Sequence, residues 1–547
     1  MKCCNKCVTP DTKSESSKNE EDANISRSEF IEINKKLWAD DINENCDKNL
    51  LIEEMGAPFL FHGLGNHSII LNKARGYKPL WIPRDNIPLA LLRSYVPSAD
   101  HALLYKLNLW EKTKVLLSSV VAYIKVLLKR DILSFKYDGI KYGDLVYDGY
   151  LDRKKVGTIK HIDLLVLSYI KKCIRRHVII TKTLKLNNIS AVLVSHRIGI
   201  MSAVILRAAL KQGCEVYSEI GYHRATLTRC NKMEDIIKYE LSASAEDLKK
   251  LTSLPQEKFD QVYEFVKRFH IHGDSNMDAK YAFSSDNKFY EDRESFAKAY
   301  NLDPNKKNVF VMLHAFTDFP HSHFKWMIFK DYADWFLKTL EYAKKDNTVN
   351  WIFKRHPSDK FYPTKDIDFK KLFKNAPNNV IFLDNDDQLD TRSLIHISDA
   401  IITCLGSAGF EIPAMAGVPS ITAGDNHYYG LNFSINPKTK KEYFETLSKL
   451  KDVKKLSAEQ QKTAKAVYMF IHYFSCVNFS SMPVLTHAQH HKPNPDEWFW
   501  DMAIELYKSN PPKIKEEINA YASIVAKEDF SALRSTLSEL EDKGLLK

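Results

Sequence analysis

The sequence predicts an α/β protein with two doubly wound domains, a disordered N-terminal tail and a helical C-terminal extension. Short apolar runs of the strand type alternate with helical segments through the second half of the chain, as in a parallel sheet covered by helices. A strand–helix–strand unit of the same kind lies in the first half. With 547 residues, the chain is also too long for one ordinary hydrophobic core. Two α/β domains therefore account for most of the chain.

Domain boundaries follow from changes in composition along the chain. Residues 1–29 are rich in serine, lysine, asparagine and acids, and we expect them to be disordered. Residues 30–300 form the predicted N-terminal domain, which carries two basic helices. Residues 301–445 form the C-terminal domain, and residues 446–547 form the helical extension.

Composition narrows the classes of partner. Hydrophobic residues make up 44% of the chain and charged residues 27%, as in soluble globular proteins. The net charge of +10 favours anionic partners such as nucleotides, phospholipid head groups or acidic glycans. We expect no nucleic acid as partner, because no helix-turn-helix, zinc-finger or aromatic RNA-binding pattern occurs. No apolar run of about 18 residues predicts a membrane span.

The N-terminus and the cysteines indicate a compartment. The N-terminus lacks an apolar signal-peptide segment, and nine scattered cysteines fit a reducing cytoplasm. Cys3, Cys4 and Cys7 lack a fourth zinc ligand, so we interpret them as an exposed reduced tail, with acylation as the alternative. Lys2 stands where N-myristoylation needs glycine. The predicted location is the cytoplasm, with the inner face of the plasma membrane as a peripheral site.

The first half of the chain is predicted to run through the following elements. They are a strand at 58–62, a strand at 79–82, a basic helix at 103–130, a loop rich in Gly, Asp and Tyr at 137–150, a second basic helix around 171–176, and a βαβ unit with strands at 190–196 and 215–218 around a helix at 200–212. The helix at 103–130 is both apolar and basic. It either packs into the domain with its lysines reaching outward or lies on an anionic bilayer surface.

The second half is predicted to be a doubly wound parallel sheet reached through a polar helical region at 240–307. Its elements are strands at 308–314, 351–354, 380–383, 400–403 and 419–422, with helices at 332–344, near 393 and from 410; further helices follow to 471 and at 495–507. The carboxyl ends of such strands are where open α/β sheets bind ligands.

Two of these strands run into loops suited to phosphate. The strand at 351–354 stops in Lys354, Arg355 and His356, which supply charge and hydrogen-bond donors for an anion. The strand at 400–403 runs into a Gly-Ser-Ala-Gly loop that opens a helix. Backbone N–H groups there, together with the helix dipole, favour an anion. The two loops together predict a nucleotide-phosphate site.

These motifs resemble those of one group of enzymes. The stretch from His314 to His321, the His-Pro pair at 356–357 and the serine loop at 406–411 are similar to bacterial capsule and surface-polysaccharide glycosyltransferases of the Kdo-transferase-like and sialyltransferase-like groups. The resemblance covers roughly residues 300–435. It implies two Rossmann-like domains of GT-B-like type, a nucleotide-sugar donor in the C-terminal domain and a carbohydrate acceptor in the N-terminal one. The motif of two acids and a glycine found in some sialyltransferases is absent in that form.

Roles on the donor side follow from the chemistry of leaving-group stabilisation. His356 and Ser407 would hold the phosphate, while Lys354 or Arg355 would neutralise developing charge. Glu411 would accept hydrogen bonds from ribose hydroxyls; alternatively, it complements the dipole of its helix.

The general base is expected across the cleft, on the N-terminal domain. Asp144 and Asp148 are the candidates, with His196 at a strand end in reserve; alternatively, the glycine-flanked aspartates make turns. His314 and Asp318 are assigned to the donor side, with a strand-end cap and a turn as the alternative.

We expect no cofactor and no metal ion, because the cationic loops can replace a divalent ion. His487, His490 and His491 lie in a Pro/Asn-rich segment that we interpret as solvated loop. The predicted function is transfer of a sugar from a nucleotide-activated donor, with CMP as one candidate nucleotide, onto a cell-surface polysaccharide or lipid-linked glycan. A polyol-phosphate transferase of the teichoic-acid type and a nucleotide-sugar 2-epimerase remain the alternatives.

Overall fold

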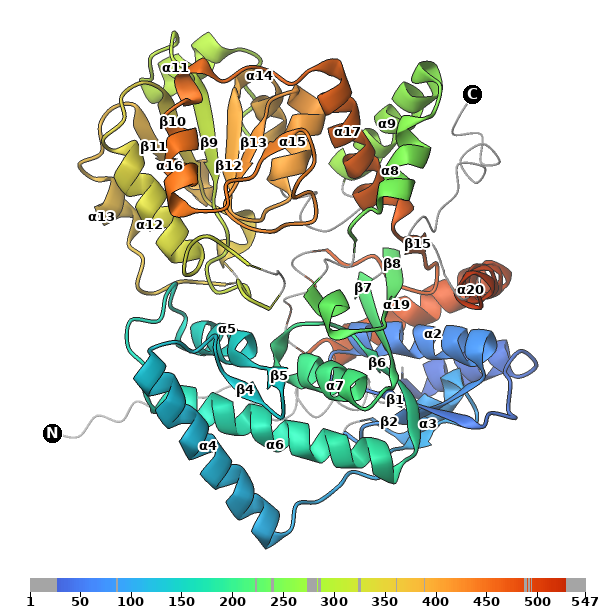
Figure 1. Ribbon diagram of the computed structural model, residues 1–547. Coiled ribbons are helices and arrows are strands. Elements are labelled where there is room, and N and C mark those ends of the chain that lie inside the picture. Colours follow the sequence, from blue (N-terminus) through green and yellow to red (C-terminus); the bar gives the residue numbers. More distant parts are fainter. Residues whose placement is uncertain are drawn as a thin grey trace, which may run out of the picture.

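The computed structural model of the chain shows two α/β halves (Figure 1). It describes residues 27–527 apart from 85–86, 222–223, 238–240, 273–282, 284–286, 323–325, 361, 388, 487–488, 490–491 and 493. The predicted tail up to residue 26, with its three cysteines, lies outside the described residues. So do His487, His490, His491 and the last part of the extension, 528–547.

The first half is built on a seven-stranded sheet in the order β15-β8-β7-β6-β1-β2-β3. Its strands are β1 (Lys48–Ile52), β2 (Tyr77–Trp81), β3 (Asp100–His101), β6 (Ile189–Val194), β7 (Glu215–Gly221), β8 (Arg224–Cys230) and β15 (Val477–Asn478). Strands β3, β2, β1, β6 and β7 are parallel, whereas β8 and β15 add an antiparallel edge. The strand order reverses between β1 and β6, which makes the carboxyl end of that pair a topological switch point.

The second half is built on a six-stranded parallel sheet in the order β11-β10-β9-β12-β13-β14. Its strands are β9 (Asn308–Met312), β10 (Asn350–Lys354), β11 (Val380–Leu383), β12 (Ala400–Thr403), β13 (Ser420–Thr422) and β14 (Ser434–Ile435). The central strands are buried on both faces, which explains their continuous apolar sequences.

Helices cover both sheets, and a hairpin of β4 (Lys136–Tyr137) and β5 (Ile140–Lys141) stands apart. An unlabelled helix spans 27–38; the others in the first half are α2 (Pro58–Arg75), α3 (Leu89–Tyr95), α4 (Leu109–Lys129), α5 (Gly143–Lys154), α6 (Leu164–Leu186) and α7 (Gly199–Lys211). In the connection and second half they are α8 (Ala245–Thr252), α9 (Gln256–Ile271), α11 (Arg293–Tyr300), α12 (Tyr332–Ala343), α13 (Phe369–Phe373), α14 (Leu394–Ile397), α15 (Ala408–Ala416), α16 (Lys440–Leu447) and α17 (Ala458–Met469). None of the helices in the described part of the chain combines the length and apolar character needed to span a bilayer.

The C-terminal elements return to the first half. A π-helical turn, η6 (Phe470–Phe474), extends α17, β15 pairs with β8, and helices α19 (Asp496–Ser509) and α20 (Pro511–Val525) pack against α2. Phe499, Trp500 and Ile518 of these helices share one hydrophobic core with Phe59 and Leu193. The predicted extension therefore completes the core of the first half.

The predicted fold class is confirmed in that the chain has two Rossmann-like α/β halves, each a largely parallel sheet covered by helices. Two local predictions were wrong. Residues 58–62 begin helix α2 instead of forming a strand, because an apolar run that is buried on all sides looks the same in either structure. Residues 143–150 lie in helix α5 instead of a loop. A Cβ on Gly143 would lie 2.6 Å from the Leu133 backbone, so the glycine serves close packing at the start of this helix.

Candidate functional site

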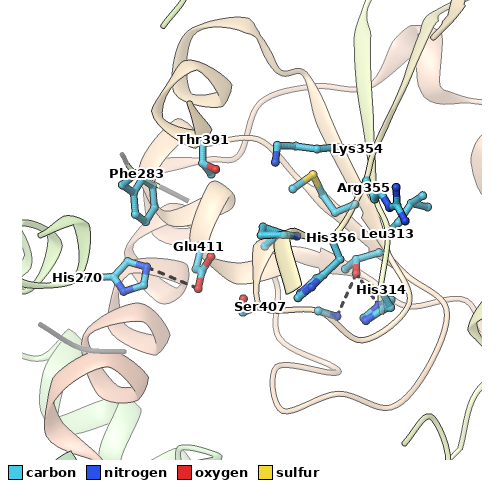
Figure 2. A pocket seen from close by; sticks show the side chains of 15 residues that line it. His270, Phe283, Leu313, His314, Lys354, Arg355, His356, Thr391, Ser407 and Glu411 are labelled. Atoms are coloured by element: carbon cyan, nitrogen blue, oxygen red, sulfur yellow. Dashed lines mark hydrogen bonds and ion pairs between the residues drawn. The ribbon is translucent and has the colours of Figure 1, made fainter. Parts of the chain in front are cut away.

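One pocket gathers most of the residues assigned to the donor. It lies at the carboxyl ends of β9, β10 and β12, and encloses about 860 Å³ counting the space open to solvent. Its lining residues are His270, Phe283, Met312, Leu313, His314, Lys354, Arg355, His356, Pro357, Thr391, Thr403, Gly406, Ser407, Ala408 and Glu411 (Figure 2). Six of the seven predicted donor residues therefore meet in this pocket.

The serine loop is held in shape by close packing. A Cβ on Gly409 would lie 1.9 Å from the Tyr428 hydroxyl, so only glycine fits there. That hydroxyl donates to the Gly406 carbonyl at 2.7 Å. Ser407 then starts helix α15, and its exposed side chain makes no capping hydrogen bond. The loop thus presents a hydroxyl and a helix N-terminus to the pocket, which suits an anion.

His356 and Lys354 supply the complementary charge and donors. The Ser358 N–H donates to His356 Nδ1 at 3.1 Å, so the proton of a neutral His356 sits on Nε2. In this tautomer the N–H donor of the ring is on Nε2. Lys354 extends from β10 toward Thr391 (Figure 2), and burial lowers the pKa of its amine to about 8. At neutral pH it still carries its charge.

Arg355 plays a more structural part than predicted. Its guanidinium donates to Asp359 at 2.5 and 2.8 Å and to Asp384 at 2.8 Å. It therefore ties the loop after β10 to the loop after β11. Two carboxylates offset its charge, so Lys354 is the stronger source of positive charge for a phosphate.

His314 supports the serine loop from below. Its Nε2 accepts the Leu405 N–H at 3.1 Å and lies 3.2 Å from Thr403 Oγ1, while its ring stacks on Tyr332 with centroids 4.1 Å apart. Burial lowers the pKa of His314 to about 3, so the ring is neutral. Asp318 lies in the following turn, where its N–H donates to the Ala315 carbonyl, and is not among the described residues that line the pocket.

Sequence reasoning missed two histidines beside Glu411. His270 on α9 and His472 in η6 place their Nε2 atoms 3.8 and 3.3 Å from Glu411 Oε1. Burial lowers the pKa of each histidine to about 3. The three residues come from segments far apart in the sequence, so no local sequence pattern predicts that they lie together. The π-helical turn that carries His472 belongs to a class of irregularity frequent at functional sites.

This His–Glu–His cluster has the residue types of a metal site but not the geometry. Its ligand atoms lie within 4.8 Å of one another, whereas tetrahedral zinc ligands lie about 3.3 Å apart. The two imidazole rings are stacked, with centroids 3.7 Å apart and planes inclined by 23°. Nearly parallel rings cannot aim both lone pairs at one ion without rotating. The arrangement instead fits two neutral imidazoles that orient the Glu411 carboxylate at the pocket wall.

Asp144, one of the predicted bases, is engaged inside the first half. Both carboxylate oxygens accept hydrogen bonds from Arg207, at 2.9 and 2.6 Å, and the pair is buried. The Arg207 charge holds the pKa of Asp144 below its ordinary value despite burial, which acts in the opposite direction. Its role as a base stays a prediction, and its contacts are those of a structural ion pair.

Asp148 connects the two halves. Its carboxylate accepts the Ser322 hydroxyl at 2.5 Å and the N–H groups of Ser322 and His321 at 2.8 and 3.2 Å. Burial raises the pKa of Asp148 to about 8, against the effect of the Ser322 hydrogen bonds. The adjacent Tyr147 hydroxyl donates to Asp331 at 2.7 Å. Helix α5 therefore fastens the first half to the second, and the catalytic role of Asp148 stays a prediction.

The reserve base, His196, follows β6 at the topological switch point of the first sheet. Ser195 Oγ lies 2.7 Å from His196 Nδ1, and the Ser195 N–H donates to Glu53, which follows β1. Burial raises the pKa of Glu53 to about 7. His196 is half-buried, whereas Glu53 is buried. Two titratable groups, joined through Ser195, therefore lie where open α/β sheets bind ligands. Glu53 was missed because β1 was not among the predicted strands.

Comparison with known proteins gives only distant likenesses. No family model matches the chain, and no curated protein matches it. Similar solved structures include the Thermosulfurimonas dismutans KpsC β-Kdo 2,4 transferase, with 13% identity, 51% of this chain and 79% of that chain covered and a TM-score of 0.29. A second is a UDP-GlcNAc 2-epimerase from Neisseria meningitidis, with 13% identity, 78% of this chain and 96% of that chain covered and a TM-score of 0.24. A third is a glycosyltransferase from Rickettsia africae, with 12% identity, 86% of this chain and 99% of that chain covered and a TM-score of 0.25. TM-scores of this size carry no functional argument, so function has to follow from the site itself.

Proposed function

We propose that the chain is a glycosyltransferase that moves a sugar from a nucleotide-activated donor, with a CMP-linked sugar as one candidate, onto a surface polysaccharide or lipid-linked glycan. The observation that carries the proposal is the convergence of His356, Lys354 and the Ser407 helix N-terminus on one pocket. Each of the three recognises phosphate by a different means: an N–H donor, a charge and a helix dipole. A donor phosphate in this pocket is held at the point where negative charge develops when the nucleotide leaves.

Glu411 completes the donor site as proposed. Its carboxylate lies at the pocket wall between His270 and Ser407 (Figure 2). Two ribose hydroxyls can donate to one carboxylate, and His270 and His472 lie against the Glu411 carboxylate. This arrangement favours a ribonucleotide over an inorganic phosphate.

The proposed sugar transfer requires an acceptor hydroxyl bound opposite the donor. The acceptor hydroxyl oxygen attacks the anomeric carbon, the bond from that carbon to the phosphate oxygen breaks, and the nucleotide leaves with the bonding electrons. The hydroxyl proton passes to a base, for which we propose His196 at the switch point of the first sheet. Neutral imidazole is the form that accepts a proton. No metal is needed in this scheme, because Lys354 and His356 stabilise the leaving phosphate.

A ligand panel tests the donor assignment. We expect one class among CMP-, UDP-, GDP- and CDP-linked sugars to raise the melting temperature, because a ligand at a hundred times its Kd adds about 2.7 kcal/mol of stability. The preferred donor should then be consumed only with a glycan acceptor present. Failure of every nucleotide to bind contradicts the proposal. Conversion of the donor to its 2-epimer without acceptor would replace it with the epimerase alternative.

A further inference from the structure

Helix α4 carries an apolar face that the protein does not cover. Its buried residues are Val115, Ser119 and Val126, which pack on the α6 side of their shared core. Its exposed large apolar residues are Leu109, Trp110, Leu116, Leu117, Val120, Val121, Ile124, Leu127 and Leu128. Leu117 is 60% exposed and Leu128 is 81% exposed, values expected for polar surface positions. So many exposed apolar side chains on one helix mark a surface made to be covered.

The helical repeat separates these residues into two faces. At about 100° per residue, the three buried positions fall within roughly 40° of one another. The nine exposed apolar positions fall within roughly 140° on the opposite side. Lysines flank this outer face: Lys114 and Lys125 lie along one edge, and Lys112 lies along the other. An apolar stripe with cations at its edges is the pattern of a helix that lies in a membrane interface.

The surroundings of α4 extend the positive charge. A groove at its C-terminal end is lined by Leu127 of the helix and by Arg130 just after it. Lys160, His161 and Lys330 line the groove as well, against one acid, Asp131. Figure 1 shows α4 at the outer edge of the first half, beyond α6 and away from the second sheet. The helix therefore lies where a flat surface can approach it.

We propose that α4 docks the protein on an anionic phospholipid bilayer. The apolar face enters the acyl boundary, while the flanking lysines and the groove cations contact head-group phosphates. A second copy of this chain fits less well, because a two-fold pairing of these faces would bring the lysine edges of both copies together. Arg176 of the second basic helix, α6, pairs with Glu54 at 2.8 and 3.1 Å, so its charge is already offset within the protein. Docking therefore rests on α4 and does not depend on the nucleotide pocket.

Vesicle co-sedimentation of the full chain tests the proposal. We expect binding to phosphatidylcholine vesicles that contain phosphatidylglycerol, weaker binding at high salt, and little binding to phosphatidylcholine alone. The L117E/V121E double variant should reduce the partition constant by roughly tenfold or more, since burying even one leucine is worth over a factor of ten. Its matched control is I435E/V484E, which changes two exposed apolar residues elsewhere and should bind as the unmodified protein does.

Two further measurements keep the outcomes separate. Melting temperature and nucleotide affinity should be unchanged in L117E/V121E, which shows that the variant is folded and that donor binding is independent of docking. Trp110 is 73% exposed, so its fluorescence should be quenched by brominated lipid, and W110F should remove that signal. Absence of binding to anionic vesicles at low salt, or unchanged binding of L117E/V121E, overturns the proposal. Self-association that L117E/V121E abolishes, without vesicle binding, would assign the face to a second copy.

Discussion

The pocket of the second sheet and helix α5 of the first half are both rich in polar side chains. The polar groups of the pocket face open space, whereas those of α5 face other residues of the protein. In the pocket, Ser407, Lys354 and Glu411 line open space at the ends of the strands. On α5, Asp144 and Asp148 point at Arg207 and Ser322, and both carboxylates are buried. The difference teaches that a cluster of acids or bases indicates chemistry only when its groups are left facing a cavity.

The largest expected effect is a loss of kcat that tells whether His196 or Asp148 is the general base. His196→Ala should lower kcat by about a hundredfold or more, as expected when a general base is lost, with donor affinity nearly unchanged. Asp148→Asn keeps an oxygen that can accept from Ser322, so kcat should change much less. Steady-state kinetics of both variants provide the measurement. The reverse ranking would return catalysis to α5 and remove the contrast drawn above.

The next effect concerns the pocket alone. His356→Ala should weaken nucleotide binding by about 1.5–3 kcal/mol, because a hydrogen bond to a charged phosphate is lost. His396→Ala is the matched control, since that histidine is exposed on α14 in the same half. Calorimetric affinities for folded forms of both proteins decide the matter. Equal affinities would show that the phosphate lies elsewhere.

A pH effect should appear on α5. Burial raises the pKa of Asp148 to about 8, above its unfolded value of 3.8, so the folded state holds this proton more tightly. The contribution of Asp148 to the free energy of unfolding is fully present below about pH 4 and is lost as pH rises through about 8. The free energy of unfolding falls by at most about 1.4 kcal/mol per pH unit over this range. Asp148→Asn should remove this slope. Urea unfolding across the range measures it, and an identical slope in the variant would mean that Asp148 is charged throughout.

The smallest effect should appear in the pocket at alkaline pH. The pKa of Lys354 is lowered by burial to about 8, so its charge is present below that pH and is lost above it. Donor affinity should therefore fall by about tenfold or less as pH rises past about 8, in line with one charge-assisted contact. Lys354→Arg should keep its affinity over the same range, because arginine stays protonated. Calorimetry at several pH values tests the difference.

The second sheet was largely predictable from the sequence. Its central strands are buried on both faces, so each reads as an unbroken apolar run that ends in a loop, and the strands beginning near 308, 350, 380 and 400 were placed closely. The serine loop was equally predictable from the sequence, because close packing at Gly409 requires glycine and the start of the helix requires small residues. Residues predicted at these strand ends line the pocket, and their roles stay predictions.

The first half was less predictable for identifiable reasons. Strands β8 and β15 are antiparallel additions whose pairing depends on segments far away in sequence. The His270 and His472 contacts with Glu411 arise from the packing of α9 and η6, which no local pattern encodes. Domain boundaries and the cytoplasmic location remain predictions. The catalytic role of the α5 acids stays a prediction, because residue type alone does not show that Arg207 and Ser322 already contact them.

The return of the chain to the first sheet has a consequence for biosynthesis. Helices α19 and α20 supply Phe499, Trp500 and Ile518 to the core that Phe59 and Leu193 begin. The ribosome releases the first sheet long before it releases these helices, whereas all six strands of the second sheet follow one another without such a delay. The second half can therefore fold while the first still waits with an apolar surface open to solvent. Nascent chains should need protection by a chaperone during that interval, and premature termination before α19 should yield aggregates.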